Sequence, residues 1–157
     1  MKGEILNKMN EFTNFWIHST LATAIIAWFC AQVLKVVFLL LKNKKLDFRR
    51  LVGSGGMPSS HSAIVCALAC SVGLTEGFRS PDYAIAFVLA LIVMYDAAGV
   101  RRAAGQQAKI LNKLVEDWET NSQSENEKKL KELLGHTPRE VFVGAILGIL
   151  IGIIRHI

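Results

Sequence analysis

Long runs of apolar residues separated by short charged segments dominate the pattern along this chain. Four runs stand out: Trp16 to Leu41, Ser62 to Leu74, Tyr83 to Val100 and Val141 to Ile154. None shows the polar face of a helix that packs around a soluble core. A bilayer core requires about 20 predominantly apolar residues per helix, and the second and fourth runs are shorter. The pattern predicts four membrane helices, with a soluble four-helix core as the alternative.

Three prolines mark the starts of apolar runs. Pro58, Pro81 and Pro138 each stand where a connection gives way to a run. Proline is well tolerated in the first turn of a helix, where its missing N–H loses no hydrogen bond. Thr137-Pro138-Arg139-Glu140 also matches a capping box, in which a Thr and a Glu side chain cap the same helix start. We therefore expect helices to begin at these prolines.

The segment between the third and fourth runs has a different pattern. Its apolar residues recur at the spacing of one helix face: Leu111, Leu114, Val115 and Trp118. This predicts an amphipathic helix over about Gly105 to Trp118, lying along the membrane surface or on a partner helix. Residues 119–129 are polar and predict a flexible loop, and a second short helix is expected over Glu125 to Leu134. The chain thus predicts a single all-α domain over residues 1–157: an integral-membrane bundle of about four transmembrane helices plus one or two amphipathic or cytoplasmic helices.

Composition agrees with a membrane environment and narrows the partners. Hydrophobic residues make up 52% of the chain, and the net charge is +5. A positive balance fits attraction to anionic lipid head groups. Nucleic acid is not expected as a partner, because no surface of interleaved aromatic and basic residues accompanies the charge. Cys30, Cys66 and Cys70 all lie in apolar runs, so neither a disulfide framework nor a metal site is expected.

The charged loops predict the orientation. The connection after the first run is strongly basic: it carries Lys42, Lys44, Lys45, Arg49 and Arg50 against Asp47. Basic loops stay in the cytoplasm, so this end of the bundle should face the cytoplasm. Alternating spans then place two histidines and four arginines at this same end: His61, His136, Arg49, Arg50, Arg101 and Arg102. His18 and His156 fall at the other end.

The segment Gly55-Gly56-Met57-Pro58-Ser59-Ser60-His61-Ser62 is the hardest to explain by structure alone. A helix N-terminus with free N–H groups, preceded by glycines that allow close approach, can hold a phosphate. A histidine beside it can transfer a proton or attack phosphorus. One serine would suffice to cap the helix, and capping requires neither Gly55 and Gly56 nor His61.

Three cations on the same side each allow two interpretations. Arg49 and Arg50 are explained equally well as topology signals and as phosphate ligands, whose planar fork binds two oxygens at once. Lys35 lies near the end of the first run. Its position slightly favours a lysine that snorkels to the head groups over a phosphate ligand.

Two acidic residues also carry alternatives. Asp96 interrupts an apolar run, which is costly unless it is paired, and Arg101 or Arg102 is the expected partner. Without such a pair the two arginines could simply snorkel. The capping box explains Glu140 without chemistry, but a carboxylate four residues after His136 could instead fix its tautomer. These two interpretations of Glu140 are hard to combine, because His136 precedes the cap.

Three motifs resemble those of a known family. Pro58-Ser59-Ser60-His61 resembles the Pro-Ser-Gly-His motif of the type-2 phosphatidic acid phosphatase and vanadium haloperoxidase superfamily. The wider strings at 55–63, 94–102 and 135–141 resemble its divergent bacterial and plant branch. The resemblance extends from about Ile17 onward, and the three strings together are specific to that branch.

The resemblance implies a role for each site residue. It makes His61 the general acid, with Ser59 and the Ser60 N–H holding phosphate oxygens. The phosphate-binding cations would be Lys35, Arg49 or Arg50, and Arg101 or Arg102. The family has a nucleophilic histidine six residues after its arginine, where this chain has Gln107. Either His136 attacks instead, oriented by Glu140, or the protein binds phosphate without cleaving it.

The favoured hypothesis is a lipid phosphatase of the plasma or inner membrane whose site faces the cytoplasm. It would hydrolyse a phosphomonoester or pyrophosphate, such as phosphatidylglycerophosphate or phosphatidic acid, through a phosphohistidine and without a metal or other cofactor. The alternative is a non-catalytic protein that binds anionic lipid or phosphate. A transporter or channel is a third hypothesis, because Lys35 and Asp96 lie within apolar runs. A homodimer is expected, since a second copy would help to bury these two charges.

Overall fold

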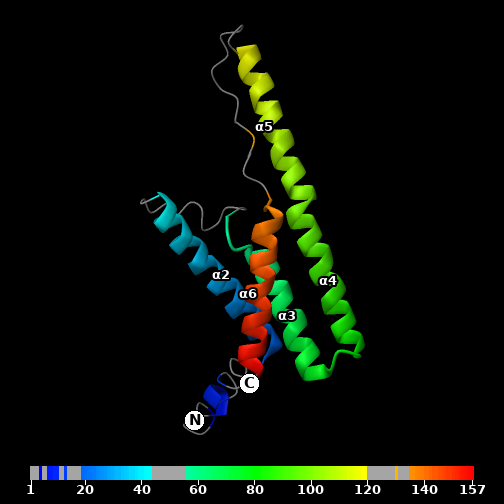
Figure 1. The fold of residues 1–157 in the computed structure, drawn as a ribbon. Helices are drawn as coiled ribbons and strands as arrows, with labels where there is room; N and C mark the ends of the chain where they lie inside the picture. Colours follow the sequence, from blue (N-terminus) through cyan, green and yellow to red (C-terminus); the bar gives the residue numbers. More distant parts are fainter. Residues whose placement is uncertain are drawn as a thin grey trace.

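The structure is a computed structural model that describes residues 4, 7–10, 13, 19–43, 56–119, 130 and 135–157. Every regular element in these ranges is a helix, which confirms the predicted all-α class. The helices are α2 (Thr20–Asn43), α3 (Ser60–Glu76), α4 (Pro81–Ala98), α5 (Val100–Glu119) and α6 (Pro138–His156) (Figure 1). Several predicted features lie outside the described residues: Arg49, Arg50, Gly55, most of the loop at 119–129 and the helix expected over Glu125 to Leu134.

The helix starts follow the capping signals with one exception. Pro81 and Pro138 occupy the first turn of their helices, as predicted, and Thr137 forms the expected capping box. The prediction was wrong for Pro58. Ser59 is the N-cap of α3, because its side chain accepts a hydrogen bond from the Ser62 N–H at 3.3 Å. The helix therefore begins at Ser60, and Pro58 lies buried just before the cap.

Helix α3 is the centre of the bundle and packs against α2, α4 and α6. Its contact with α6 is made by Gly144, Gly148 and Gly152, which recur one helical turn apart and face small residues of α3. A β-carbon at Gly144 would meet the Ser59 carbonyl, and one at Gly148 would meet the Ala63 carbonyl. Small residues at this spacing let two helix backbones approach closely, as is common in membrane proteins. We call this contact the α3–α6 seam.

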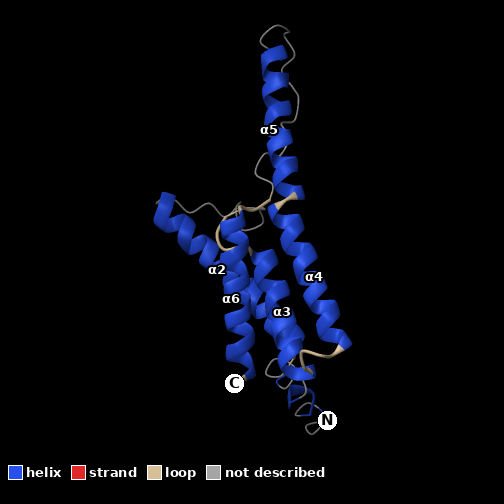
Figure 2. Cartoon of the chain, turned by 45° about the vertical axis from the view of Figure 1, so that its right-hand side comes forward, coloured by secondary structure: helices blue, strands red, loops and turns tan. Residues whose placement is uncertain are grey.

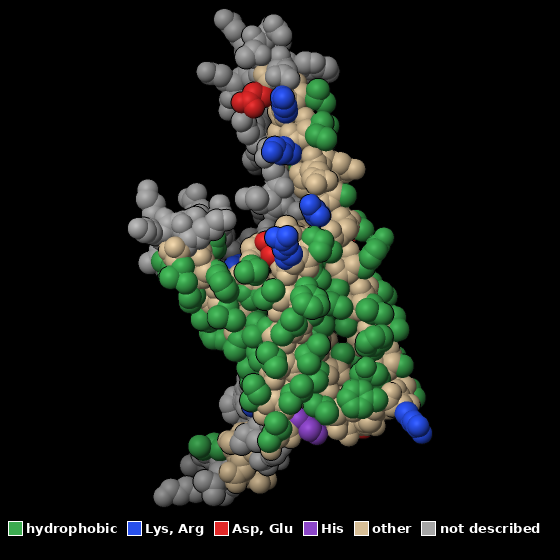
Figure 3. Space-filling model, in the orientation of Figure 1, with side chains coloured by type: hydrophobic (Ala, Val, Ile, Leu, Met, Phe, Trp, Pro, Cys, Tyr) green, Lys and Arg blue, Asp and Glu red, His purple; other side chains and the backbone are tan. Residues whose placement is uncertain are grey.

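Small side chains fill the interior of the bundle and large apolar side chains cover its surface, the opposite of a soluble protein. The buried residues are mainly small, including Ala22, Ala27, Ala63 and Ala67. Large apolar side chains face outward instead; on the face in Figure 3 they cover most of the bundle, and most Lys and Arg side chains lie beyond one end of it. A water-exposed surface of this kind would be unfavourable, whereas lipid favours it. The burial pattern therefore supports a bundle embedded in a membrane.

Two helical segments of the described chain are long and apolar enough to cross a bilayer by themselves. They are Thr20–Leu41 and Pro81–Glu116. Helix α3 is apolar but has only 17 residues. Helix α6 has 19 residues and carries charged side chains in its first and last turns. The prediction of four spans therefore rests on α3 and α6 crossing as part of the packed bundle.

Helix α5 continues α4 and projects beyond the bundle (Figures 1 and 2). The link at Gly99 keeps its backbone paired, because the Gly99 N–H donates to Tyr95 O at 2.8 Å and the Ala103 N–H donates to Gly99 O at 2.9 Å. The helix thus starts five residues before the predicted Gly105. Ile110, Leu111 and Leu114 are exposed along its apolar face. Because α5 extends away from the bundle, this direction favours the partner-helix alternative over the membrane-surface one.

Candidate functional site

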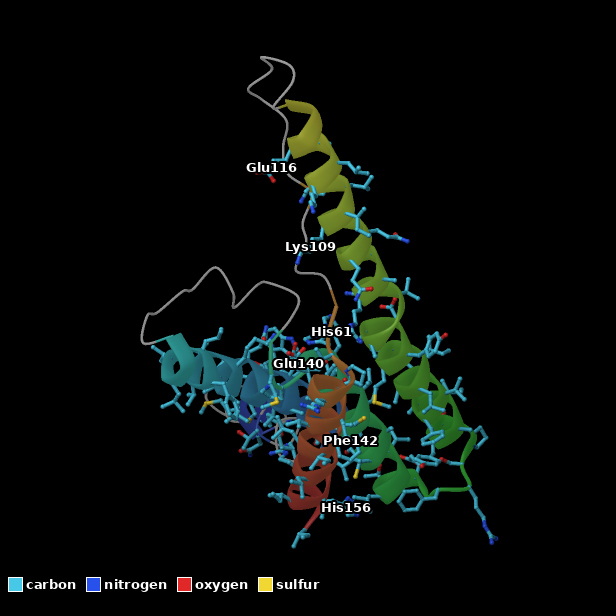
Figure 4. The ribbon with its side chains drawn as sticks, turned by 45° about the horizontal axis from the view of Figure 1, so that its top comes forward. His61, Lys109, Glu116, Glu140, Phe142 and His156 are labelled. Atoms are coloured by element: carbon cyan, nitrogen blue, oxygen red, sulfur yellow. The ribbon has the colours of Figure 1, made fainter. Side chains whose placement is uncertain are left out.

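Two histidines from motifs far apart in the sequence meet where α3 and α6 begin. The ring centroids of His61 and His136 lie 5.8 Å apart with the rings in an edge-to-face arrangement. His61 and Glu140 lie at the same end of the bundle, whereas His156 lies at the opposite end (Figure 4). The topology inferred from the charge pattern therefore placed these histidines correctly relative to one another.

The backbone around Gly135 explains how a residue so distant in sequence reaches the site. Gly135 has a φ of +84°, and a β-carbon there would overlap the backbone of Arg102. The next residue donates its N–H to Ala97 O at 2.9 Å, which ties the approach to α6 onto the end of α4. His136 is consequently only 2% exposed. Neither Gly135 nor the Ala97 carbonyl was predicted to contribute, although the Gly-His-Thr-Pro string marked this turn.

Glu140 combines the two roles that were expected to be alternatives. Its Oε2 accepts a hydrogen bond from the Thr137 N–H at 3.0 Å and also lies 3.2 Å from His136 Nδ1. The expected conflict does not arise, because the residue before an N-cap can fold back over the same carboxylate. The Glu140 backbone carbonyl in turn accepts the Ser59 N–H at 3.0 Å. One residue thus caps α6, orients a histidine and joins the starts of α3 and α6.

The contact with Glu140 defines the chemistry of His136. A carboxylate only accepts hydrogen bonds, so Nδ1 carries a proton and Nε2 keeps its lone pair. Nε2 is buried and makes no well-formed hydrogen bond among the described residues, although the Gly56 backbone lies close enough to the ring to raise the pKa of His136. Burial lowers the pKa of His136 below its ordinary 6.5, although Glu140 acts in the opposite direction. A neutral imidazole whose Nε2 keeps its lone pair is the form that can attack an electrophile.

Two predicted cations lie close to these rings. Lys35, on α2, is 2% exposed, and its side chain passes beside Gly56, where a β-carbon would lie 3.4 Å from Lys35 Cγ. Its charge acts on both histidines and on Glu140. A buried lysine in this position does not snorkel to the head groups, so the structure supports the ligand interpretation of Lys35.

The arginine pair behaves differently at its two positions. Arg101 Nε donates to Asp96 Oδ2 at 2.6 Å, which confirms that Asp96 is paired. Both charges act on His61, so this pair borders the site. Both arginine side chains are exposed, but only the Arg101 charge acts on His61, whereas Arg102 contributes the backbone that Gly135 packs against. Arg101 is therefore the better candidate for a phosphate ligand.

The serines and Gln107 complete the predicted set. Ser59 and Ser60 are both buried at the start of α3. The Ser59 hydroxyl accepts from the Ser62 N–H and from the Ser62 hydroxyl at 3.1 Å, which leaves its own proton to donate. Ser60 is the first residue of α3, so its N–H is one of those that helix geometry leaves without an internal partner. Gln107 is exposed on α5, beyond the end of the bundle where the histidines meet.

The comparisons agree with the motifs. A family model described as the divergent PAP2 family matches residues 16–151. The uncharacterized membrane protein YuiD of Bacillus subtilis (strain 168) is 44% identical over 156 residues, which cover 93% of this chain and 96% of that protein. No solved structure matches the chain. The match spans the segments that carry His61, Arg101 and His136. This chain is a membrane protein that belongs to the divergent PAP2 family.

Proposed function

We propose that this protein is a lipid phosphatase that hydrolyses a lipid phosphomonoester or pyrophosphate through a phosphohistidine on His136. One observation carries the proposal: the His136 ring lies edge to face with His61, Glu140 occupies its Nδ1, and its buried Nε2 makes no well-formed hydrogen bond among the described residues. A capping role for Glu140 would not require a histidine there, and a buried polar nitrogen without a partner is costly unless a ligand uses it.

The first half of the reaction transfers the phosphoryl group to the protein. His136 Nε2 attacks phosphorus, and the bond between phosphorus and the leaving oxygen breaks, with its electron pair passing to that oxygen. His61 donates a proton to the leaving oxygen and so releases the lipid alcohol from a monoester, or the lipid monophosphate from a pyrophosphate. Lys35 and Arg101 neutralise charge on the phosphoryl oxygens, and the Ser60 N–H can donate to one of them.

The second half regenerates the site. Water attacks the phosphohistidine while His61 accepts its proton, and the bond between phosphorus and Nε2 breaks to return the electron pair to His136. The products are inorganic phosphate and neutral His136. Glu140 stabilises the imidazole throughout, because His136 Nδ1 remains hydrogen-bonded to it while positive charge develops on the ring.

The proposal also includes the orientation of the protein in the membrane and its lipid substrate. The basic connection before α3 supports a cytoplasmic site in a multi-pass membrane protein. That side gives access to phosphatidylglycerophosphate or phosphatidic acid in the inner leaflet. We also propose a homodimer, in which the exposed face of α5 contacts the second copy.

A non-catalytic binding protein is the second candidate. The observation that favours it is Gln107, which stands where the family has its nucleophilic histidine and lies exposed on α5. In that case Lys35 and Arg101 would hold the phosphate of an anionic lipid, and no phosphohistidine would form.

Release of inorganic phosphate tests the proposal. Purified protein is incubated with phosphatidylglycerophosphate, phosphatidic acid and a prenyl pyrophosphate, alongside His61→Ala, His136→Ala and the control Gln107→Ala. We expect release from at least one substrate by the wild type and the control, and a reduction of at least about a hundredfold in both histidine variants. Inert wild-type protein that still binds the lipids would support the binding protein instead.

A further inference from the structure

An apolar groove runs along the lower part of the bundle between α3, α4 and α6. Its volume is about 410 Å³, within the range of about 300–1,000 Å³ that small-molecule sites occupy. The lining comes from all three helices: Cys66, Ala69, Cys70, Leu74, Phe78, Tyr83, Phe87, Ala90, Leu91, Met94, Ala145, Ile149 and Ile153. No charged side chain belongs to this set. This lining favours a hydrocarbon ligand.

The near end of the groove begins below the histidines. Cys66 lies five residues after His61 on α3, which is about 7 Å along a helix. Across the groove, Met94 lies 3.6 Å from the Cys66 sulfur and two residues before Asp96, the partner of Arg101. The candidate site and the near end of the groove are therefore separated by about one and a half turns of α3 and half a turn of α4.

The far end is bordered by aromatic rings. Phe78 and Tyr83 stack edge to face with centroids 5.1 Å apart, and Phe87 lies 5.8 Å beyond Tyr83. Gly73 makes room for this cluster, because a β-carbon there would lie 2.6 Å from Phe78 Cε1. From Cys66 to Leu74 the groove extends about 12 Å along α3. Because Phe78 and Tyr83 flank the turn between α3 and α4, the aromatic cluster lies at the end of the bundle opposite the histidines.

We infer that this groove binds a hydrocarbon chain of the substrate lipid and that the aromatic cluster at its far end limits the length of that chain. The inference rests on the proposed function and names the substrate class: a phosphate-bearing lipid whose chain enters from the surrounding bilayer. Two features support this occupant: the near end of the groove begins about one and a half turns of α3 below His61, and its lining is almost entirely apolar in a membrane-embedded bundle. A phosphate held beside His61 and His136 places the chain of its own molecule at the groove entrance.

A chain-length series tests the inference through the rate of phosphate release. Leu91→Trp enlarges a groove-lining side chain that is already 48% exposed, and Ala90→Phe fills the groove from a buried position. The matched control is Ile92→Trp on the neighbouring, lipid-facing position, which is 60% exposed and does not line the groove. We expect both groove variants to raise KM for long-chain substrates by about tenfold relative to a short-chain substrate. Equal effects of Leu91→Trp and Ile92→Trp at every chain length would overturn the inference.

A binding measurement separates this inference from the proposed function. The wild-type protein in vesicles is photocrosslinked to phosphatidic acid that carries a diazirine near the end of one acyl chain, and the labelled peptides are identified by mass spectrometry. We expect labels at the far end of the groove, on Leu74, Phe78 or Phe87, and their loss in Leu91→Trp. Groove labelling without phosphate release would leave the groove assignment standing and contradict the phosphatase. Phosphate release with labels confined to lipid-facing positions such as Ile92, or to a second copy of the chain, would support the phosphatase and contradict the groove assignment.

Discussion

The two sides of α3 are packed in opposite ways. On the side of α6, glycines one turn apart bring two backbones together, so that side chains at Gly144 and Gly148 would meet carbonyl groups. On the side of α4, the residues are also small, yet the helices leave a groove of about 410 Å³. The α3–α6 seam holds His61 and Glu140 in a fixed relation, whereas the groove offers space to a ligand. One face of α3 thus positions the candidate site residues, and another face lines the groove that we propose binds the lipid chain.

Disruption of the seam should have the largest effect. Gly148→Val places a side chain against the Ala63 carbonyl and the Ala67 N–H, which cannot move without displacing α3. Overpacking of this kind costs about 1–3 kcal/mol or more, and it also moves His61 away from Glu140. We expect a clearly lowered Tm in detergent and loss of phosphate release. The control is Leu150→Val on the lipid-facing side of α6, expected to cost no more than about 1 kcal/mol. Equal Tm values for the two variants would contradict a tight seam.

The next largest effect should come from the contact between Glu140 and His136, which the seam holds in place. Glu140→Gln keeps an oxygen that can cap α6 but removes the negative charge beside His136. Because that charge raises the pKa of His136 against the effect of burial, its removal lowers the pKa further. The nucleophile is the neutral ring, so the acidic limb of the pH–rate profile should move to lower pH. The plateau rate should fall by about tenfold or more, since the charge no longer stabilises the phosphorylated ring.

Two outcomes would contradict this account of Glu140. An acidic limb that moves to higher pH would mean that Glu140 does not stabilise the protonated ring. An unchanged profile and rate would reduce Glu140 to its capping role. The matched control is Arg139→Gln in the same turn of α6, whose side chain is exposed and which should leave the acidic limb in place.

The α4 side should be the most tolerant. Asp96→Asn breaks the pair with Arg101, but both side chains are substantially exposed, at 37% and 48%. Exposed pairs contribute about 0–1 kcal/mol, so KM should rise by no more than about fivefold while kcat changes little. Asp82→Asn at the far end of α4 is the control for loss of one negative charge. A loss of kcat as large as that of Glu140→Gln would show that Asp96 takes part in the chemistry.

The sequence predicted the elements and which residues share an end of the bundle. Apolar runs bounded by Ser80-Pro81 and Thr137-Pro138 carry strong local signals, and the structure has helices there. The charge pattern grouped His61 with His136. The start of α3 was missed by two residues because Pro58 was taken as the first helical residue, although Ser59 forms the cap.

The contacts that complete the site could not be predicted in the same way. The hydrogen bond from His136 N–H to Ala97 O joins residues far apart in sequence and depends on the positive φ of Gly135. Backbone contacts of this kind leave no local pattern in either partner. The groove is also invisible in sequence, because it arises where small residues on three helices face one another. The roles of Arg49, Arg50 and Gly55 remain predictions outside the described residues.

Detection of the covalent intermediate tests the central claim most directly. Wild-type protein is mixed with a lipid substrate whose phosphate carries ³²P, quenched in alkali, in which phosphohistidine is stable, and digested for mass spectrometry. The account predicts a label on His136 that persists in Gln107→Ala and is absent from His136→Ala. Phosphate release without a labelled histidine, or a label on His61 instead of His136, would contradict it.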